Sequence, residues 1–190
     1  MALTHRFLLA LLWLAWAAFW WAASRRVKPT QRSESLRSRM MHILPLTVAV
    51  ILLWWPPGSG AAWNARFLPV APWPFWLGAA LTLAGLLFAV WARVQLGGNW
   101  SGIVTLKLDH ALVTSGPYAV VRHPIYTGLL LAFAGTAIAL GQWRGIVAVA
   151  LVLWSFWRKL QVEERWMCER FGARYEEYRR SVATLVPFLW

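Results

Sequence analysis

The chain has 190 residues, of which 59% are hydrophobic, and its mean hydropathy is +0.50. Soluble domains contain roughly 45–50% apolar residues, so this composition excludes an ordinary soluble domain and indicates an integral membrane protein. A formal net charge of +12 would suit nucleic-acid binding only on a folded polar face with base-reading elements, for which little sequence is left. The single cysteine, Cys168, excludes an internal disulfide and a multi-cysteine metal site.

Five apolar runs occupy residues 7–23, 41–55, 75–96, 125–140 and 145–160. Several approach the ~17–25 residues needed to cross a bilayer, and the shorter ones would extend into flanking residues. We predict an all-α membrane protein of one domain with five transmembrane helices. Residues 1–96 would hold the first three helices, and residues 97–190 the functional region. The first run is rich in Trp and long for a signal peptide, so we expect a retained helix.

The cationic residues are unevenly distributed between the two sides of this five-helix arrangement. Sixteen of the 19 Lys and Arg residues fall on one side, and Arg6, Arg66 and Arg144 fall on the other. Cytoplasmic loops of membrane proteins carry an excess of Lys and Arg. The asymmetry therefore predicts an outside N-terminus and a cytoplasmic C-terminus.

The connections between the runs differ in composition. Residues 24–40 form a polar, basic loop, and residues 56–74 are rich in Pro and Gly, which predicts a structured outside turn. Residues 97–123 form the longest inside connection, in which the weak alternation at residues 103–108 predicts a short extended piece.

A short turn at residues 141–145 should make the fourth and fifth helices an antiparallel hairpin. Positions 123 and 163 are equally far from position 143 along the chain, and the helical rise is the same on both arms. His123 and Glu163 should therefore lie at the same cytoplasmic depth, with Glu164 beside them.

The start of the fourth helix suggests a ligand-binding corner. His123 precedes a proline and is biased to an extended conformation, and Pro124 suits the first helical position. The amides of Ile125 and Tyr126 then lie at the positive end of the helix, which favours a carboxylate or phosphate. The two acids lie at the negative end of the fifth helix, which favours a cation. A ligand carrying both a carboxylate and a positive centre would suit this corner.

A further amphipathic pattern follows the two acids. It predicts a helix on the inner membrane surface, weakened by Gly172, that either covers the site or only anchors the chain. Its apolar stripe consists of Met167, Phe171, Tyr175, Tyr178 and Val182.

Four motifs lie in the second half of the chain: Gly-Pro-Tyr at 116–118, Arg-His-Pro-x-Tyr-x-Gly at 122–128, Glu-Glu at 163–164 and Phe-Gly-x-x-Tyr-x-x-Tyr at 171–178. Joined at the hairpin spacing, they resemble the isoprenylcysteine carboxyl methyltransferase family and its phospholipid N-methyltransferase relatives. The first two helices carry no such signature.

This resemblance implies S-adenosyl-L-methionine as cofactor, in a cytoplasmic pocket between the hairpin and the connecting loop. The loop would cover the adenosine, His123 and Tyr126 would meet the amino-acid part, and Glu163 would meet the ammonium group. The full set of implied cofactor-binding residues is Leu112, Val113, Gly116, Tyr118, His123, Pro124, Tyr126, Gly128 and Glu163.

The implied reaction is methyl transfer to a lipid or prenylated acceptor entering from the membrane, foremost an isoprenylcysteine-type carboxylate. A carboxylate acceptor needs only a cation to orient it, and Arg122 and Arg174 are the candidates. An amine acceptor must lose a proton, and Glu164 would then be the candidate base.

Other interpretations stay open at this point. The acceptor can be a phospholipid or another amine, and the two acids can instead form a solvated face with nearby cations such as Arg158, Lys159 or Arg165. The chain can be an NADPH-dependent membrane sterol or enone reductase, although adjacent acids suit an ammonium better than a 2′-phosphate. It can also be a non-catalytic transporter or assembly protein, although a transport pathway through a membrane protein is usually marked by ionisable residues in the middle of the membrane. The expected partners are membrane lipids and a lipid-borne substrate, with no metal and no nucleic acid.

Overall fold

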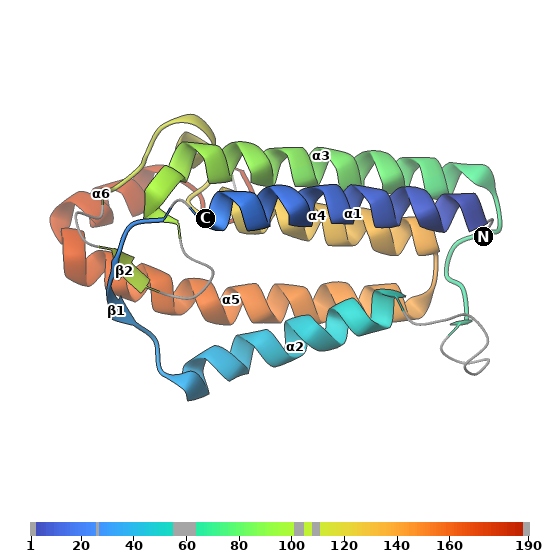
Figure 1. Cartoon of the computed structure of the whole chain (residues 1–190), viewed down its shortest axis with the longest axis horizontal. Coiled ribbons are helices and arrows are strands. Elements are labelled where there is room, and N and C mark those ends of the chain that lie inside the picture. Colours follow the sequence, from blue (N-terminus) through green and yellow to red (C-terminus); the bar gives the residue numbers. More distant parts are fainter. Residues whose placement is uncertain (1–2, 26, 55–63, 101–104, 108–110, 188–190) are drawn as a thin grey trace.

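The computed structural model describes residues 3–25, 27–54, 64–100, 105–107 and 111–187. Two groups of helices run side by side in Figure 1: α3 packs on α4 with α1 beside them, and α2 packs on α5. The elements, in chain order, are α1 (Leu3–Ser24), β1 (Thr30–Ser33), α2 (Leu36–Trp54), α3 (Pro72–Leu96), the 3₁₀ helix η2 (Gly97–Asn99), β2 (Thr105–Lys107), the 3₁₀ helix η3 (Gly116–Ala119), α4 (Pro124–Leu140), α5 (Trp143–Phe171) and α6 (Ala173–Ser181).

Each of the five apolar runs lies in a helix at its expected place. Four segments are long and apolar enough to cross a membrane, namely Phe7–Ser24, Leu36–Trp54, Pro72–Asn99 and Trp143–Phe171. The helix α4, Pro124–Leu140, is apolar but shorter, at 17 residues. Five membrane crossings therefore stay a prediction, whereas a helical membrane protein is what the structure supports.

The fold is helical, as predicted, and it also contains one small antiparallel sheet. The two strands pair Arg32 with Leu106 and Ser33 with Thr105. The extended piece expected at residues 103–108 is thus realised as β2, but its partner strand was not predicted. The loop before α2 is joined in this way to the long inside connection.

Small residues bring the backbones of α3 and α4 into direct contact. A Cβ atom added at Gly85 would lie only 2.4 Å from the carbonyl oxygen of Gly128, and one added at Gly135 only 2.5 Å from the amide of Thr82. Such close approach is typical of helix interfaces in membranes. The interface includes a hydroxyl pair, Thr82 and Thr136, at 3.2 Å. It sets the position of α4, which begins at the candidate site.

The chain after α5 does not continue as one amphipathic helix. Gly172, at φ 53°, ends α5, and α6 follows in a new direction. Of the predicted apolar stripe, Tyr175 and Tyr178 are buried. The segment after α6 then returns to the start of α4, where Val121 and Ala183 form a parallel bridge.

The close contact between α3 and α4 predicts that added volume at Gly85 destabilises the fold. In Gly85→Val the new side chain meets the backbone of α4, which cannot shift as a flexible side chain would. We expect a loss of about 2 kcal/mol or more in unfolding free energy, as for other overpacked cores. Thermal unfolding in detergent checks this. Ala80→Val, on the exposed face of the same helix, should stay within about 0.5 kcal/mol of the parent, and equal effects of the two variants would contradict the packing argument.

Candidate active site

A large cavity of about 730 Å³ lies between the helices. Its walls come mainly from α1, α2, α4, α5 and α6, with residues 111–113 and Tyr118. Its size is within the ~300–1,000 Å³ of ligand pockets. Polar side chains gather at the end near the start of α4, where His123, Tyr126 and Glu163 border it. The remainder is apolar and is lined by residues such as Trp13 and Phe133. One cavity therefore joins a polar end to a long apolar part.

The side chains of His123 and Glu163 lie next to each other at the polar end of the cavity. The Nδ1 atom of His123 lies 3.7 Å from Oε2 of Glu163. The hydroxyl of Tyr126 donates a hydrogen bond to the other oxygen, Oε1, at 2.6 Å. The rings of His123 and Tyr126 stack with centroids 5.6 Å apart, and Tyr126 stacks in turn on Phe156 at 4.8 Å. A carboxylate and two aromatic rings thus form a surface that suits a cationic group.

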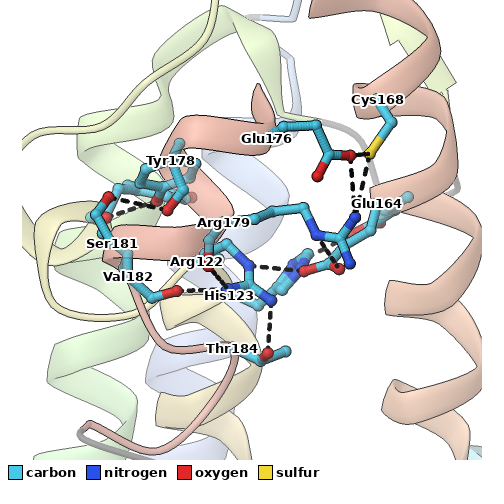
Figure 2. Close-up of polar contacts among 12 residues, drawn as sticks. Arg122, His123, Glu164, Cys168, Glu176, Tyr178, Arg179, Ser181, Val182 and Thr184 are labelled. Carbon is cyan, nitrogen blue, oxygen red and sulfur yellow. Dashed lines mark hydrogen bonds and ion pairs between the residues drawn. The ribbon is translucent and has the colours of Figure 1, made fainter. Parts of the chain in front are cut away.

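The second acid points to different partners. Oε1 of Glu164 accepts a hydrogen bond from Nε of Arg122 at 2.8 Å and lies 3.2 Å from Nε2 of His123. Its Oε2 lies 3.6 Å from Nε of Arg179, a residue of α6. Figure 2 shows this network between the start of α4, the end of α5 and the C-terminal segment. Glu164 does not line the cavity, so it is a neighbour of the site rather than part of its wall.

The C-terminal segment borders the site at the end of the cavity where α4 begins. The hydroxyl of Tyr178 donates to the carbonyl oxygen of Tyr118 at 2.6 Å. Burial raises the pKa of Tyr178 to about 12, so the phenol stays protonated and remains a donor at neutral pH. Burial also raises the pKa of Tyr118 and of Tyr175 well above the ordinary value of a phenol. These tyrosines are therefore uncharged, and their role in the structure is packing and hydrogen bonding.

Of the twelve residues given above as catalytic or cofactor-binding candidates, eight line the cavity: Leu112, Val113, Tyr118, Arg122, His123, Pro124, Tyr126 and Glu163. Gly116 instead adopts φ 61° at the start of η3 and faces the side chain of Gln95. Gly128 faces the backbone of α3. Their motif positions have a structural explanation, since a side chain at either would be strained or would push two helices apart.

The two candidate cations lie in different surroundings. Arg174 is exposed on α6 and does not line the cavity, and the donors of Arg122 are engaged by protein oxygens. In the sequence, Lys159 stands out only as one of the charges that can pair with an acid. The structure places it in the cavity wall, with Nζ 4.0 Å from Oε1 of Glu163 and 5.4 Å from the ring centroid of Tyr126. Lys159 lies one helical turn before Glu163, and this spacing was the feature of the sequence that could have placed it on the same side of the helix.

No group of three or more His, Cys, Asp or Glu side chains with metal-binding geometry occurs among the described residues.

The fold is that of a helical membrane protein whose cavity has a polar end and an apolar part, and comparison with known proteins places the chain in a family. A family model described as phospholipid methyltransferase matches residues 73–174, more than half of the chain. The chain belongs to the phospholipid methyltransferase family.

Particular relatives are methyltransferases that act on isoprenylcysteine, according to their names. The protein-S-isoprenylcysteine O-methyltransferase of Schizosaccharomyces pombe is 41% identical over 101 residues, covering 52% of this chain and 43% of the relative. The enzyme of that name from Homo sapiens is 32% identical over 178 residues, covering 83% and 57%. Protein-S-isoprenylcysteine O-methyltransferase A of Arabidopsis thaliana is 32% identical over 120 residues, covering 62% and 61%.

A solved structure is also similar: the eukaryotic intramembrane Ras methyltransferase, isoprenylcysteine carboxyl methyltransferase. It matches with a TM-score of 0.54 and 25% sequence identity, covering 84% of this chain and 55% of that chain. The chain thus spans between 43% and 61% of the length of these proteins.

The hydrogen bond from Tyr178 to the loop predicts a specific loss of stability. In Tyr178→Phe the buried carbonyl of Tyr118 loses its donor, which should cost about 1–3 kcal/mol in unfolding free energy. Thermal unfolding in detergent measures it. The matched control is Tyr175→Phe, because the hydroxyl of Tyr175 makes no hydrogen bond within the described part of the chain. A loss of the same size in the control would contradict the importance of the hydrogen bond.

Proposed function

We propose that this chain binds S-adenosyl-L-methionine at the polar end of the cavity and catalyses methyl transfer to the carboxylate of a lipid-borne acceptor of the prenylcysteine type. The observation that carries the proposal is the geometry of one cavity, in which Glu163, Tyr126 and His123 border an apolar chamber within the membrane region. Membership in a methyltransferase family and the names of the relatives support the reaction type.

The residues at the polar end fit the chemical groups of this cofactor. The Glu163 carboxylate suits the ammonium group, and His123 Nδ1 lies 3.7 Å from Glu163 Oε2. The amides of Ile125 and Tyr126 precede the first hydrogen bond of α4, which Thr127 donates to His123, and such amides bind carboxylates. Apolar walls that include Leu112 and Val113 suit the adenosine. When bound, the cofactor supplies a methyl group already activated by a positively charged sulfur.

The task of the chain is then to align donor and acceptor and to exclude water. The apolar chamber would hold the lipid chain, which places the head of the acceptor at the polar end. Lys159 lies at the boundary between the two parts and carries the charge that would orient a carboxylate. A carboxylate attacks directly and needs no base.

An amine acceptor is supported less well. It must lose a proton, and Glu164, the candidate base, is held by Arg122 and Arg179 and lies outside the cavity wall. The NADPH reductase and the non-catalytic interpretations lack comparable support, because the relatives reported above are methyltransferases.

We also propose that the chain crosses the membrane five times, with the N-terminus outside and the C-terminus and site in the cytoplasm. In the chain, α4 lies between α3 and α5, which are both long enough to span a membrane, and it packs against both of them. Its 17 residues are ~25 Å long at the usual rise. The uneven distribution of Lys and Arg supports this orientation.

The proposed reaction is tested with purified protein, radiolabelled S-adenosyl-L-methionine and N-acetyl-S-farnesylcysteine. We expect a base-labile methyl ester on the acceptor. In Glu163→Gln the loss of one charge should weaken cofactor binding about tenfold or more, which corresponds to ~1.4 kcal/mol. The control is Glu177→Gln, which removes an exposed acid of α6. Base-stable methylation of phosphatidylethanolamine would favour the amine alternative, and binding of NADPH instead of the cofactor would favour the reductase.

The role given to Lys159 predicts a separation of two constants. In Lys159→Gln we expect the KM of the carboxylate acceptor to rise about tenfold, because the orienting charge is lost. The Kd of S-adenosyl-L-methionine should change less than about threefold. Arg158→Gln serves as control, since Arg158 does not line the cavity. An unchanged acceptor KM in Lys159→Gln would exclude this role.

A further inference from the structure

The guanidinium group of Arg122 is used almost entirely by the protein itself. Its Nε donates to Glu164 Oε1 at 2.8 Å, and Nη2 donates to Thr184 Oγ1 at 2.6 Å. Its Nη1 donates to the carbonyl oxygens of Arg179, at 3.0 Å, and of Val182. A guanidinium has five N–H donors, and these contacts use four. Although atoms of Arg122 border the cavity, its side chain is only 7% exposed.

The partner of Arg122 determines how the imidazole of His123 is presented. Glu164 is held between two guanidinium groups, those of Arg122 and Arg179, and an ionised carboxylate can only accept hydrogen bonds. The Nε2 atom of His123, 3.2 Å from Oε1 of Glu164, must therefore be the donor. In a neutral ring the other nitrogen, Nδ1, then carries a lone pair, and this nitrogen faces Glu163.

The backbone of His123 is held by the same C-terminal segment. The amide of Arg122 donates to Ala183 O at 2.8 Å, and the amide of His123 donates to Thr184 O at 3.1 Å. One turn further along α4, the hydroxyl of Thr127 donates to Leu185 O at 2.6 Å. Residues 182–185, which we call the C-terminal strap, thus hold the entry of α4 on both sides of His123.

We propose that Arg122, Glu164 and the C-terminal strap are positioning elements, which fix His123 with its Nε2 proton toward Glu164 and its Nδ1 lone pair toward the cavity. Arg122 does not contact the acceptor carboxylate in this arrangement; it acts through Glu164 and His123. The consequence for ligand binding rests on the proposed function, since Nδ1 and Glu163 would then share the N–H groups of the cofactor ammonium. Changes at Arg122 should accordingly affect the cofactor, and changes at Lys159 the acceptor.

The test combines a spectroscopic signature with two binding constants. Protein labelled with ¹⁵N-histidine is studied by NMR at pH 9, where an ordinary histidine is neutral, and the His123 signals are assigned by their loss in His123→Ala. We expect a proton on Nε2 and none on Nδ1. In Glu164→Gln and in Arg122→Lys this single tautomer should give way to a mixture of the two. A proton on Nδ1 in the parent protein, or an unchanged tautomer in both variants, would overturn the proposal.

The binding constants separate positioning from direct contact. We expect Arg122→Lys and Glu164→Gln each to raise the Kd of S-adenosyl-L-methionine about tenfold. The double variant should be little worse than either single one, because the two residues act as a unit. Arg180→Lys, on the exposed side of α6, is the matched control and should leave both constants unchanged. A rise in acceptor KM alone, with Kd and tautomer unaffected, would show that Arg122 binds the acceptor.

A milder variant keeps the test valid if the others fail to fold. Thr184→Val removes only the hydrogen bond from Nη2 of Arg122, and we expect a two- to threefold rise in cofactor Kd with partial loss of the tautomer. If the parent protein shows the single tautomer but does not bind S-adenosyl-L-methionine, the positioning inference stands and the proposed function fails. Binding of the cofactor without the single tautomer would support the proposed function and overturn the positioning inference.

Discussion

The ion pair between Arg122 and Glu164 joins three parts of the chain that are distant in sequence. Arg122 immediately precedes α4, Glu164 lies near the end of α5, and the remaining donors of Arg122 reach the C-terminal segment after α6. The two side chains are only 7% and 11% exposed, and an unpaired charge in such a place costs about 3–5 kcal/mol. The three parts must therefore come together correctly, and the polar end of the cavity is formed at their junction.

Two adjacent acids on one helix serve different purposes because of helix geometry. Successive residues of an α-helix are about 100° apart around its axis, so Glu163 and Glu164 have mostly different partners, although each approaches one ring nitrogen of His123. Glu163 faces the cavity, where Tyr126 donates to it. Glu164 faces the C-terminal segment and the far side of His123. The Glu-Glu motif is thus one ligand-facing acid and one acid that supports the site from behind.

The proposed chemistry explains why such a site is built within a helical bundle. A lipid-borne acceptor has an apolar chain and a polar head, and the cavity offers an apolar chamber lined by residues of α1, α2 and α4 next to a polar end. Close packing of α3 on α4 through Gly85 and Gly128 holds the start of α4 rigidly. The polar end is thereby kept next to the apolar chamber.

From the amino-acid sequence alone, the helices and the relative depth of the polar groups along them could be predicted. Apolar runs must be buried in lipid or protein, and the equal rise of two helices in a hairpin places His123 opposite Glu163. The sequence carries no such information on the direction in which side chains point around a helix, nor on which distant segment returns to the site. The folded structure was needed to show that Arg122 is engaged by the C-terminal segment, that Lys159 lines the cavity and that β1 pairs with β2. These features depend on contacts between residues far apart in the chain, for which neither local periodicity nor helical rise carries information.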